Sequence, residues 1–270
     1  MNNFTADKHA TLTNLTRSRL GSIAWNPVRE PGITCTVCTA PIDPQYQKCA
    51  RCLQHAQSGV KVSPHVLPLT YAIKGNGQLY QDMCRYKEPS VGQEEDAPER
   101  VKFLLGYFAW THLACVSALC GIPVSRVSTV PSLRGHQEPH PLATLVQQVL
   151  HRLELPIMKL EATRIVPKPQ RSQFGPDNFD APRSLISEHV LLFEDTWVSG
   201  NNAQSAAATL YQAGAAAVTI VAAARLLDPD CWVPTRRFLE NYPEAQRQWT
   251  TACPAVGPTL LNKCRSSFVS

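Results

Sequence analysis

Residues 190–200, Val-Leu-Leu-Phe-Glu-Asp-Thr-Trp-Val-Ser-Gly, constrain the fold more than any other stretch of this chain. Four apolar residues suit a buried parallel strand, which ends in Glu194 and Asp195. A turn rich in Ser, Gly and Asn follows, and residues 203–213 predict an alanine-rich helix closed by Gly214. An acidic pair can hold ribose hydroxyls, and backbone N–H groups at a helix start can hold a phosphate. The pattern therefore points to a sugar phosphate as the ligand.

Strands and helices alternate from Pro123 onward. The apolar patterns predict strands over 124–130, 190–193 and 217–223, with helices over 141–153 and 203–213. This alternation predicts an α/β fold with a parallel sheet flanked by helices. Ligands of such sheets bind beyond the carboxyl ends of the strands, where Glu194 and Asp195 fall.

The acidic pair and its turn resemble the signature of the type I phosphoribosyltransferases. The resemblance implies that Glu194 and Asp195 bind the ribose hydroxyls of phosphoribosyl pyrophosphate, with Mg²⁺ bridging to the pyrophosphate. It also implies a 5′-phosphate loop made of Thr196, Trp197, Val198, Ser199, Gly200, Asn201 and Asn202.

Two residues depart from the family's pattern. Trp197 stands where an aliphatic residue is usual, and Asn202 where a Thr or Ser is typical. An Asn side chain can still donate to a phosphate. The alternative interpretation is an ordinary strand-to-helix turn in which Asp195 or Asn202 caps the helix.

A loop after the first predicted strand resembles the Val-Pro and Arg-Gly elements of the ComF-like phosphoribosyltransferases, a family linked to bacterial DNA uptake. The resemblance, which is amidophosphoribosyltransferase-like in the sugar-binding domain, implies a pyrophosphate site at Pro131, Ser132, Arg134 and Gly135. The alternative is a simple surface turn.

A polar segment before the acidic strand resembles the basic, mobile stretch of the same family. It implies loop contacts from Lys168 and Arg171, although solvated loop charges explain either residue equally well. Residues 69–75 and 85–87 resemble the segment that joins the ribbon to the catalytic domain, so the resemblance spans roughly residues 33–227.

Four cysteines form two close pairs, Cys35-x-x-Cys38 and Cys49-x-x-Cys52. Two such knuckles supply the four thiolates that Zn²⁺ prefers, so the spacing predicts a small structural zinc ribbon ahead of the α/β domain. Free thiols or disulfides are the alternative. The other cysteines have no such spacing. We expect Cys115 and Cys120 to be buried as small hydrophobes, and we do not expect Cys231, Cys253 and Cys264 to form a second metal site.

The composition says more about the cellular compartment of the protein than about the class of its ligand. The formal charge of +5 fits an anionic small molecule as easily as nucleic acid. The first 20 residues are polar and lack the apolar core of a signal peptide, so we expect a reducing, cytoplasmic setting with metal-binding cysteines. Residues 101–122 are apolar but carry Lys102 and His112, which favours a buried helix over a membrane span.

Changes in composition predict five segments. They are a loosely held N-terminus with room for a short helix (1–30), the zinc ribbon (31–60), a helical connecting region with an exposed loop at 88–100 (61–122), the phosphoribosyltransferase-like domain (123–228) and a C-terminal extension (229–270).

Two functions remain open from the sequence. The first is an enzyme that transfers the phosphoribosyl group to an unidentified nitrogen nucleophile. The second is a non-catalytic protein of the same fold, used for DNA uptake, nucleic-acid handling or ligand sensing, with the ribbon contacting DNA or protein. Residues 31–61 hold only Lys48, Arg51 and Lys61 as cations, which is few for binding a phosphate backbone.

Overall fold

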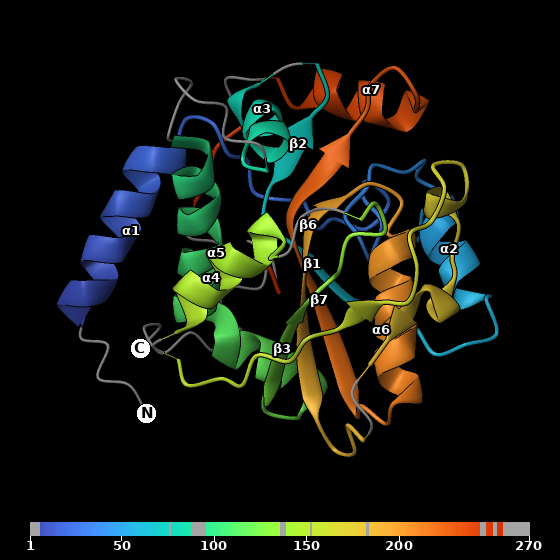
Figure 1. The fold of residues 1–270 in the computed structure, drawn as a ribbon. Coiled ribbons are helices and arrows are strands. Elements are labelled where there is room, and N and C mark those ends of the chain that lie inside the picture. Colours follow the sequence, from blue (N-terminus) through green and yellow to red (C-terminus); the bar gives the residue numbers. More distant parts are fainter. Residues whose placement is uncertain are drawn as a thin grey trace.

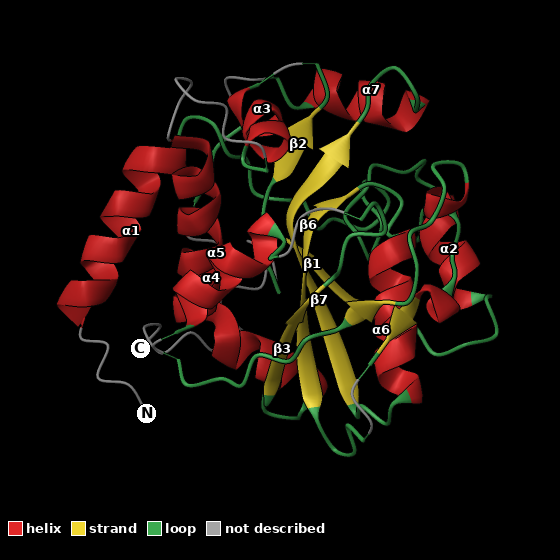
Figure 2. Cartoon of the chain, viewed as in Figure 1, coloured by secondary structure: helices red, strands yellow, loops and turns green. Residues whose placement is uncertain are grey.

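The computed structural model describes residues 6–75, 77–87, 96–135, 139–151, 153–181, 184–243, 247–250 and 253–255. They form a mixed α/β structure in which helices flank a central, mostly parallel sheet (Figures 1 and 2). The predicted fold class is therefore confirmed. The helices are α1 (Ala6–Leu20), α2 (Ala50–Ala56), α3 (Gln78–Arg85), α4 (Asp96–Cys120), α5 (Pro141–Leu150), α6 (Asn201–Gln212) and α7 (Val233–Asn241), with short 3₁₀ turns at Gln170–Ser172 and Pro176–Asn178.

The central sheet has the order β1-β7-β6-β3, and all neighbours run parallel. A further strand, β2, pairs with the end of β7. The strands are β1 (His65–Pro68), β2 (Tyr71–Ile73), β3 (Arg126–Thr129), β6 (His189–Trp197) and β7 (Ala217–Leu227), and a separate two-stranded pair joins β4 (Glu161–Ala162) to β5 (Phe179–Asp180). Because β3 and β6 are parallel neighbours, the loops that follow them leave the same edge of the sheet.

Side chains of the central strands alternate between two cores. Leu191 and Phe193 of β6 pack with α4 and α5 on one face, and Val190 and Leu192 pack with α6 on the other. This period of two is what a strand buried on both faces requires. Figure 1 shows α1, α4 and α5 on one side of the sheet and α2 and α6 on the other.

Strand β6 is longer than the sequence predicts. The predicted strand ends at Phe193, whereas the observed strand continues through the acidic pair to Trp197. The reason is its partner: β7 runs to Leu227, so Thr196 still pairs with Ala224 and Trp197 with Arg225. The predicted helix start at residue 203 is also late, because α6 begins at Asn201.

Helix α4 corrects the predicted loop over 88–100. Residues 96–100 are helical, while 88–95 lie outside the described residues. Pro98 is tolerated because it lies in the first turn, where its missing N–H has no helical acceptor. In the described part of the chain, α4 is the one helix long and apolar enough to cross a membrane by length and composition. Half of that apolar window is buried within the protein, against α1, α5 and the sheet.

The sheet also draws on residues that the sequence assigns to a connecting region. Strands β1 and β2 come from the segment 61–87, and both pair with β7. In the N-terminal segment, α1 packs against α4 and buries Leu20 completely.

Candidate functional site

A cleft of about 410 Å³ opens at the carboxyl edge of β3 and β6. It brings together side chains from the acidic pair, the turn after it, the loop after β3 and the polar segment before β6. The predicted site residues that line it are Pro131, Ser132, Arg134, Lys168, Arg171 and all nine residues from Glu194 to Asn202. Of the predicted set, Gly135 does not line the cleft.

Asp195 lies at the centre of a polar cluster in the cleft. The Tyr86 hydroxyl donates to its carboxylate at 3.1 Å, the Lys87 ammonium forms an ion pair with it, and the Thr196 N–H also donates to it. Burial opposes the ionisation of Asp195, but the Lys87 charge and the hydrogen bonds from Lys87 and the Thr196 N–H lower its pKa overall.

The pKa of Glu194 shifts in the opposite direction to that of Asp195. Burial, and then the neighbouring charge of Asp195, raises the pKa of Glu194 well above its usual value. Its Oε2 atom is buried and has no hydrogen-bond partner among the described residues. The two neighbouring carboxyl groups therefore differ in how readily they ionise, and Glu194 leaves a buried oxygen without a protein partner beside the cleft.

The turn after β6 is packed tightly against an indole ring. Gly200 has a φ of +79°, and a Cβ built on it would lie 2.1 Å from Cζ2 of Trp197. Trp197 itself is 1% exposed, so its bulk fills the core beneath the turn. One Nη1 group of Arg225 donates to the carbonyl oxygens of both Trp197 and Val198. The turn is thus fixed by a glycine, a buried ring and a guanidinium.

Helix α6 begins directly at this turn. Its N-cap is Gly200, and no side-chain capping bond is made there, which disagrees with the alternative that Asp195 or Asn202 caps the helix. The Asn201 N–H lies 3.3 Å from the Ser199 hydroxyl. The helix therefore presents its positive end to the cleft, an arrangement suited to an anion.

The loop after β3 is tied to the basic segment. The Val166 N–H donates to the carbonyl oxygen of buried Leu133 at 2.9 Å, and the Arg171 guanidinium donates to the Val166 carbonyl oxygen. Arg134 and Lys168 are both exposed at the rim. With Lys87, the cleft is lined by four cations and two acids, a charge balance that suits a polyanionic ligand with hydroxyl groups.

The sequence prediction missed Lys87 and His140 as cleft residues. His140 is the N-cap of α5, and its Nδ1 accepts from the Leu142 N–H at 3.3 Å. Lys87 follows Tyr86, which lies 109 residues from Asp195 in the sequence. No local pattern signals that contact, because the residues that follow α3 meet β6 only in the folded protein.

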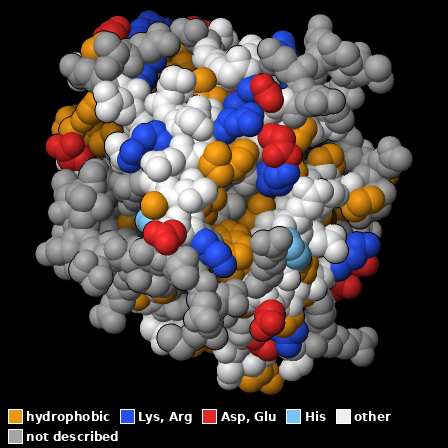
Figure 3. All heavy atoms as spheres, turned by 90° about the vertical axis from the view of Figure 1, so that its left-hand side faces the viewer, with side chains coloured by type: hydrophobic (Ala, Val, Ile, Leu, Met, Phe, Trp, Pro, Cys, Tyr) orange, Lys and Arg blue, Asp and Glu red, His pale blue; other side chains and the backbone are white. Residues whose placement is uncertain are grey.

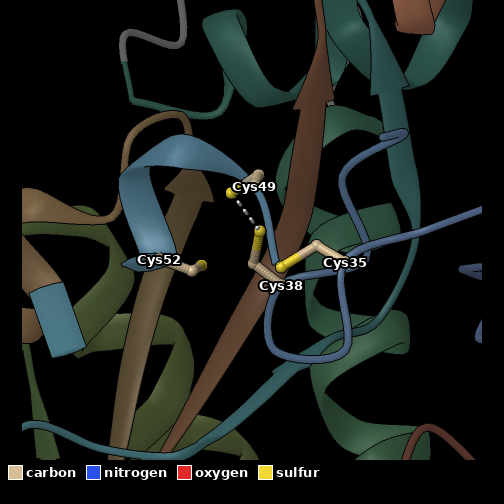
Figure 4. A group of neighbouring side chains, drawn as sticks. All are labelled: Cys35, Cys38, Cys49 and Cys52. Carbon is tan, nitrogen blue, oxygen red and sulfur yellow. Dashed lines mark hydrogen bonds between the residues drawn. The ribbon is translucent and has the colours of Figure 1, made fainter. Parts of the chain in front are cut away.

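The four paired cysteines converge on one point (Figure 4). Their sulfur atoms all lie within 4.8 Å of one another, and Cys38 Sγ is 3.7 Å from Cys49 Sγ. Four thiolates around one Zn²⁺, with Zn–S bonds of about 2.3 Å, place sulfurs about 3.8 Å apart. The cluster can therefore hold a metal ion such as zinc, with all four ligands supplied by the protein.

The two cysteine pairs have different local structures. Cys35 and Cys38 lie in a tight turn, in which the Cys35 N–H donates to the Ala40 carbonyl oxygen at 2.7 Å. Cys49 is the N-cap of α2, and Cys52 lies in its first turn. A helix start favours thiolates because its dipole stabilises negative charge.

The cysteine cluster is packed onto the α/β core and does not stand apart from it. Cys35, Cys38 and Cys52 belong to the same buried cluster as β6 and α6. Ser63 and Gln204 are joined by two hydrogen bonds of 2.8 Å, which attach the segment after α2 to α6. The four-cysteine segment therefore shares the core that supports the cleft.

No family model matches this sequence, and no curated protein matches it. Among solved structures, the chain is similar to a crystal structure of adenine phosphoribosyltransferase, with 14% identity and a TM-score of 0.33. The likeness covers 53% of this chain and 76% of that chain. At this TM-score it supports no assignment of function.

Proposed function

We propose that this protein binds phosphoribosyl pyrophosphate together with Mg²⁺ and transfers the phosphoribosyl group to a nitrogen nucleophile. The observation that carries the proposal is the cleft itself. It joins an acidic pair, a helix start and four cations, one group for each part of such a ligand.

The acidic pair is matched to the ribose. Asp195 is ionised and can accept from one hydroxyl, while the buried Oε2 of Glu194 is open to a second. Negative charge held at this position also stabilises the positive charge that develops at the sugar C1 as pyrophosphate leaves.

The two phosphate groups have separate partners. The 5′-phosphate fits the turn and the start of α6, and the pyrophosphate fits the loop of Ser132 and Arg134. Lys168 and Arg171 also line the cleft and balance the remaining charge. Carboxylates beside a bound pyrophosphate suit Mg²⁺, which binds through carboxylates and phosphate oxygens and neutralises the leaving group.

Calorimetric titration with phosphoribosyl pyrophosphate and Mg²⁺ tests the proposal directly. We expect the wild type to bind and the Glu194→Ala/Asp195→Ala variant to lose that binding. A matched control is Glu161→Ala/Asp180→Ala, which removes two exposed carboxylates of β4 and β5. Absence of binding by the wild type would sink the proposal. Pyrophosphate release in the presence of nucleobases or ammonia then tests for turnover.

A second candidate is a non-catalytic sensor of the same ligand. Tyr86 and Lys87 already satisfy Asp195, so a ligand must share or displace these contacts. Binding without pyrophosphate release across the acceptor panel would favour this function.

Nucleic-acid binding has less support. On the face drawn in Figure 3, Lys and Arg side chains are interspersed with Asp and Glu and form no continuous basic surface among the described residues.

The four thiols of the four-cysteine centre favour a reducing, cytoplasmic setting for the protein.

A further inference from the structure

A second group of candidate metal ligands lies outside the set of residues that line the cleft. His112 and Cys115 are three residues apart on one face of α4, and Cys253 comes from the C-terminal segment. Their exposures are 3%, 3% and 1%. One ligand atom from each lies within 4.8 Å of those of the other two, and Cys115 Sγ is 3.8 Å from His112 Nδ1.

The donor set is chemically specific. Two sulfurs and one imidazole nitrogen are soft and borderline ligands that zinc accepts readily. With Zn–S near 2.3 Å and Zn–N near 2.0 Å, a tetrahedral ion separates sulfur from nitrogen by about 3.6 Å. The distance of 3.8 Å between Cys115 Sγ and His112 Nδ1 is close to the separation that a bound zinc ion would require.

The segment that carries Cys253 is held in place by contacts of its own. The Arg29 Nε–H donates to the Pro254 carbonyl oxygen at 2.9 Å, and Asn26 exchanges hydrogen bonds with the backbone of Thr250. Trp249 packs edge-on against Tyr107, whose ring lies 5.8 Å from that of His112. These contacts bring Cys253 to α4 without any help from the thiols.

We propose that His112, Cys115 and Cys253 bind a second zinc ion, which joins the C-terminal segment to α4. Among the described residues, the group supplies three ligands to this ion, two thiolates and one imidazole. Binding releases the thiol protons of Cys115 and Cys253 to solvent, and no oxidation or reduction takes place. Because the group is buried and lies outside the cleft, the ion is structural.

Zinc counting on the purified full chain tests this site. After growth with added zinc, we expect two zinc ions per wild-type chain, and one in Cys253→Ser and in Cys115→Ser. Cys231→Ser and Cys84→Ser are matched controls, because both thiols are exposed, and each should keep two. Cys49→Ser/Cys52→Ser should keep the ion proposed here and lose the other.

A cobalt spectrum gives a second readout that needs no variant of the four-cysteine centre. The difference between Co²⁺-loaded wild type and Cys253→Ser should contain a thiolate-to-cobalt charge-transfer band. The absence of this band would overturn the proposal. So would a zinc content that equals the wild-type value in Cys253→Ser and falls to zero in Cys49→Ser/Cys52→Ser. A disulfide between Cys115 and Cys253, detected as the loss of two hydrogens in the intact mass, would overturn it as well.

Discussion

His55 of α2 and Asn201, the first residue of α6, are joined by a hydrogen bond of 2.6 Å between Nε2 and Oδ1. His55 is 3% exposed, and burial lowers its pKa although the Asn201 contact opposes that shift. Because Cys49 is the N-cap of α2 and Cys52 lies in its first turn, this bond links the four-cysteine centre to the turn that lines the cleft.

Removing the metal from the four-cysteine centre should therefore weaken ligand binding in the cleft. A strong chelator is expected to reduce affinity for phosphoribosyl pyrophosphate by about tenfold, the value of one hydrogen bond of about 1.4 kcal/mol. Calorimetric titration in the presence of Mg²⁺, before chelation and after the chelator has been dialysed away, measures the change. His55→Ala should reproduce the loss while keeping the metal, and unchanged affinity in both samples would contradict the coupling.

Gly200→Ala should destabilise the protein by about 2–4 kcal/mol. The added Cβ would meet the Trp197 ring, and φ of +79° is unfavourable for alanine. Gly59→Ala is the matched control, since Gly59 has a φ of +80° with nothing within 4 Å of its added Cβ, and should cost only about 1 kcal/mol. Urea unfolding gives both values, and equal costs would refute a role for the ring.

Arg225→Met should weaken ligand binding without removing a ligand contact. The guanidinium holds the carbonyl oxygens of Trp197 and Val198, and hydrogen bonds from a charged group contribute about 1.5–3 kcal/mol. We expect the Kd for phosphoribosyl pyrophosphate to rise by at least about tenfold. Arg236→Met, at an exposed position on α7, should leave the Kd unchanged. Equal effects in the two variants would mean that the clamp has no part in binding.

Glu194→Gln should change how stability depends on pH. The folded-state pKa of Glu194 is raised, first by burial, so its contribution is present below the usual value of 4.5 and is lost as the pH rises through the folded-state pKa. Gln cannot ionise, and the variant should gain stability relative to wild type with rising pH. Urea unfolding between about pH 5 and pH 8 checks this. Parallel curves would contradict it, and exposed Glu161→Gln should show no such trend.

Much of the fold could be read from local patterns. The apolar positions Leu142, Leu145, Val146, Val149 and Leu150 of the predicted helix are all buried in α5, because helical spacing places them on one face. The strand over 190–193 was likewise predictable from four apolar residues, since both faces of β6 are covered.

The ends of the strands were less predictable from the sequence, because they depend on the neighbouring strands in the sheet. Strand β6 reaches Trp197 only because β7 is long enough to pair with it. The same holds for β1 and β2, whose short sequences join the sheet through β7. Pairing between distant strands leaves no mark in either sequence.

Local sequence patterns were enough to predict the parallel α/β fold, the acidic pair at a strand end and the two cysteine pairs, because periodicity and ligand spacing are local properties of a chain. The folded arrangement was needed to reveal three further contacts: Lys87 and Tyr86 with Asp195, His55 with Asn201, and Cys253 with His112 and Cys115. Those contacts join residues far apart in the chain, and the packing of helices against both faces of the sheet brings them together.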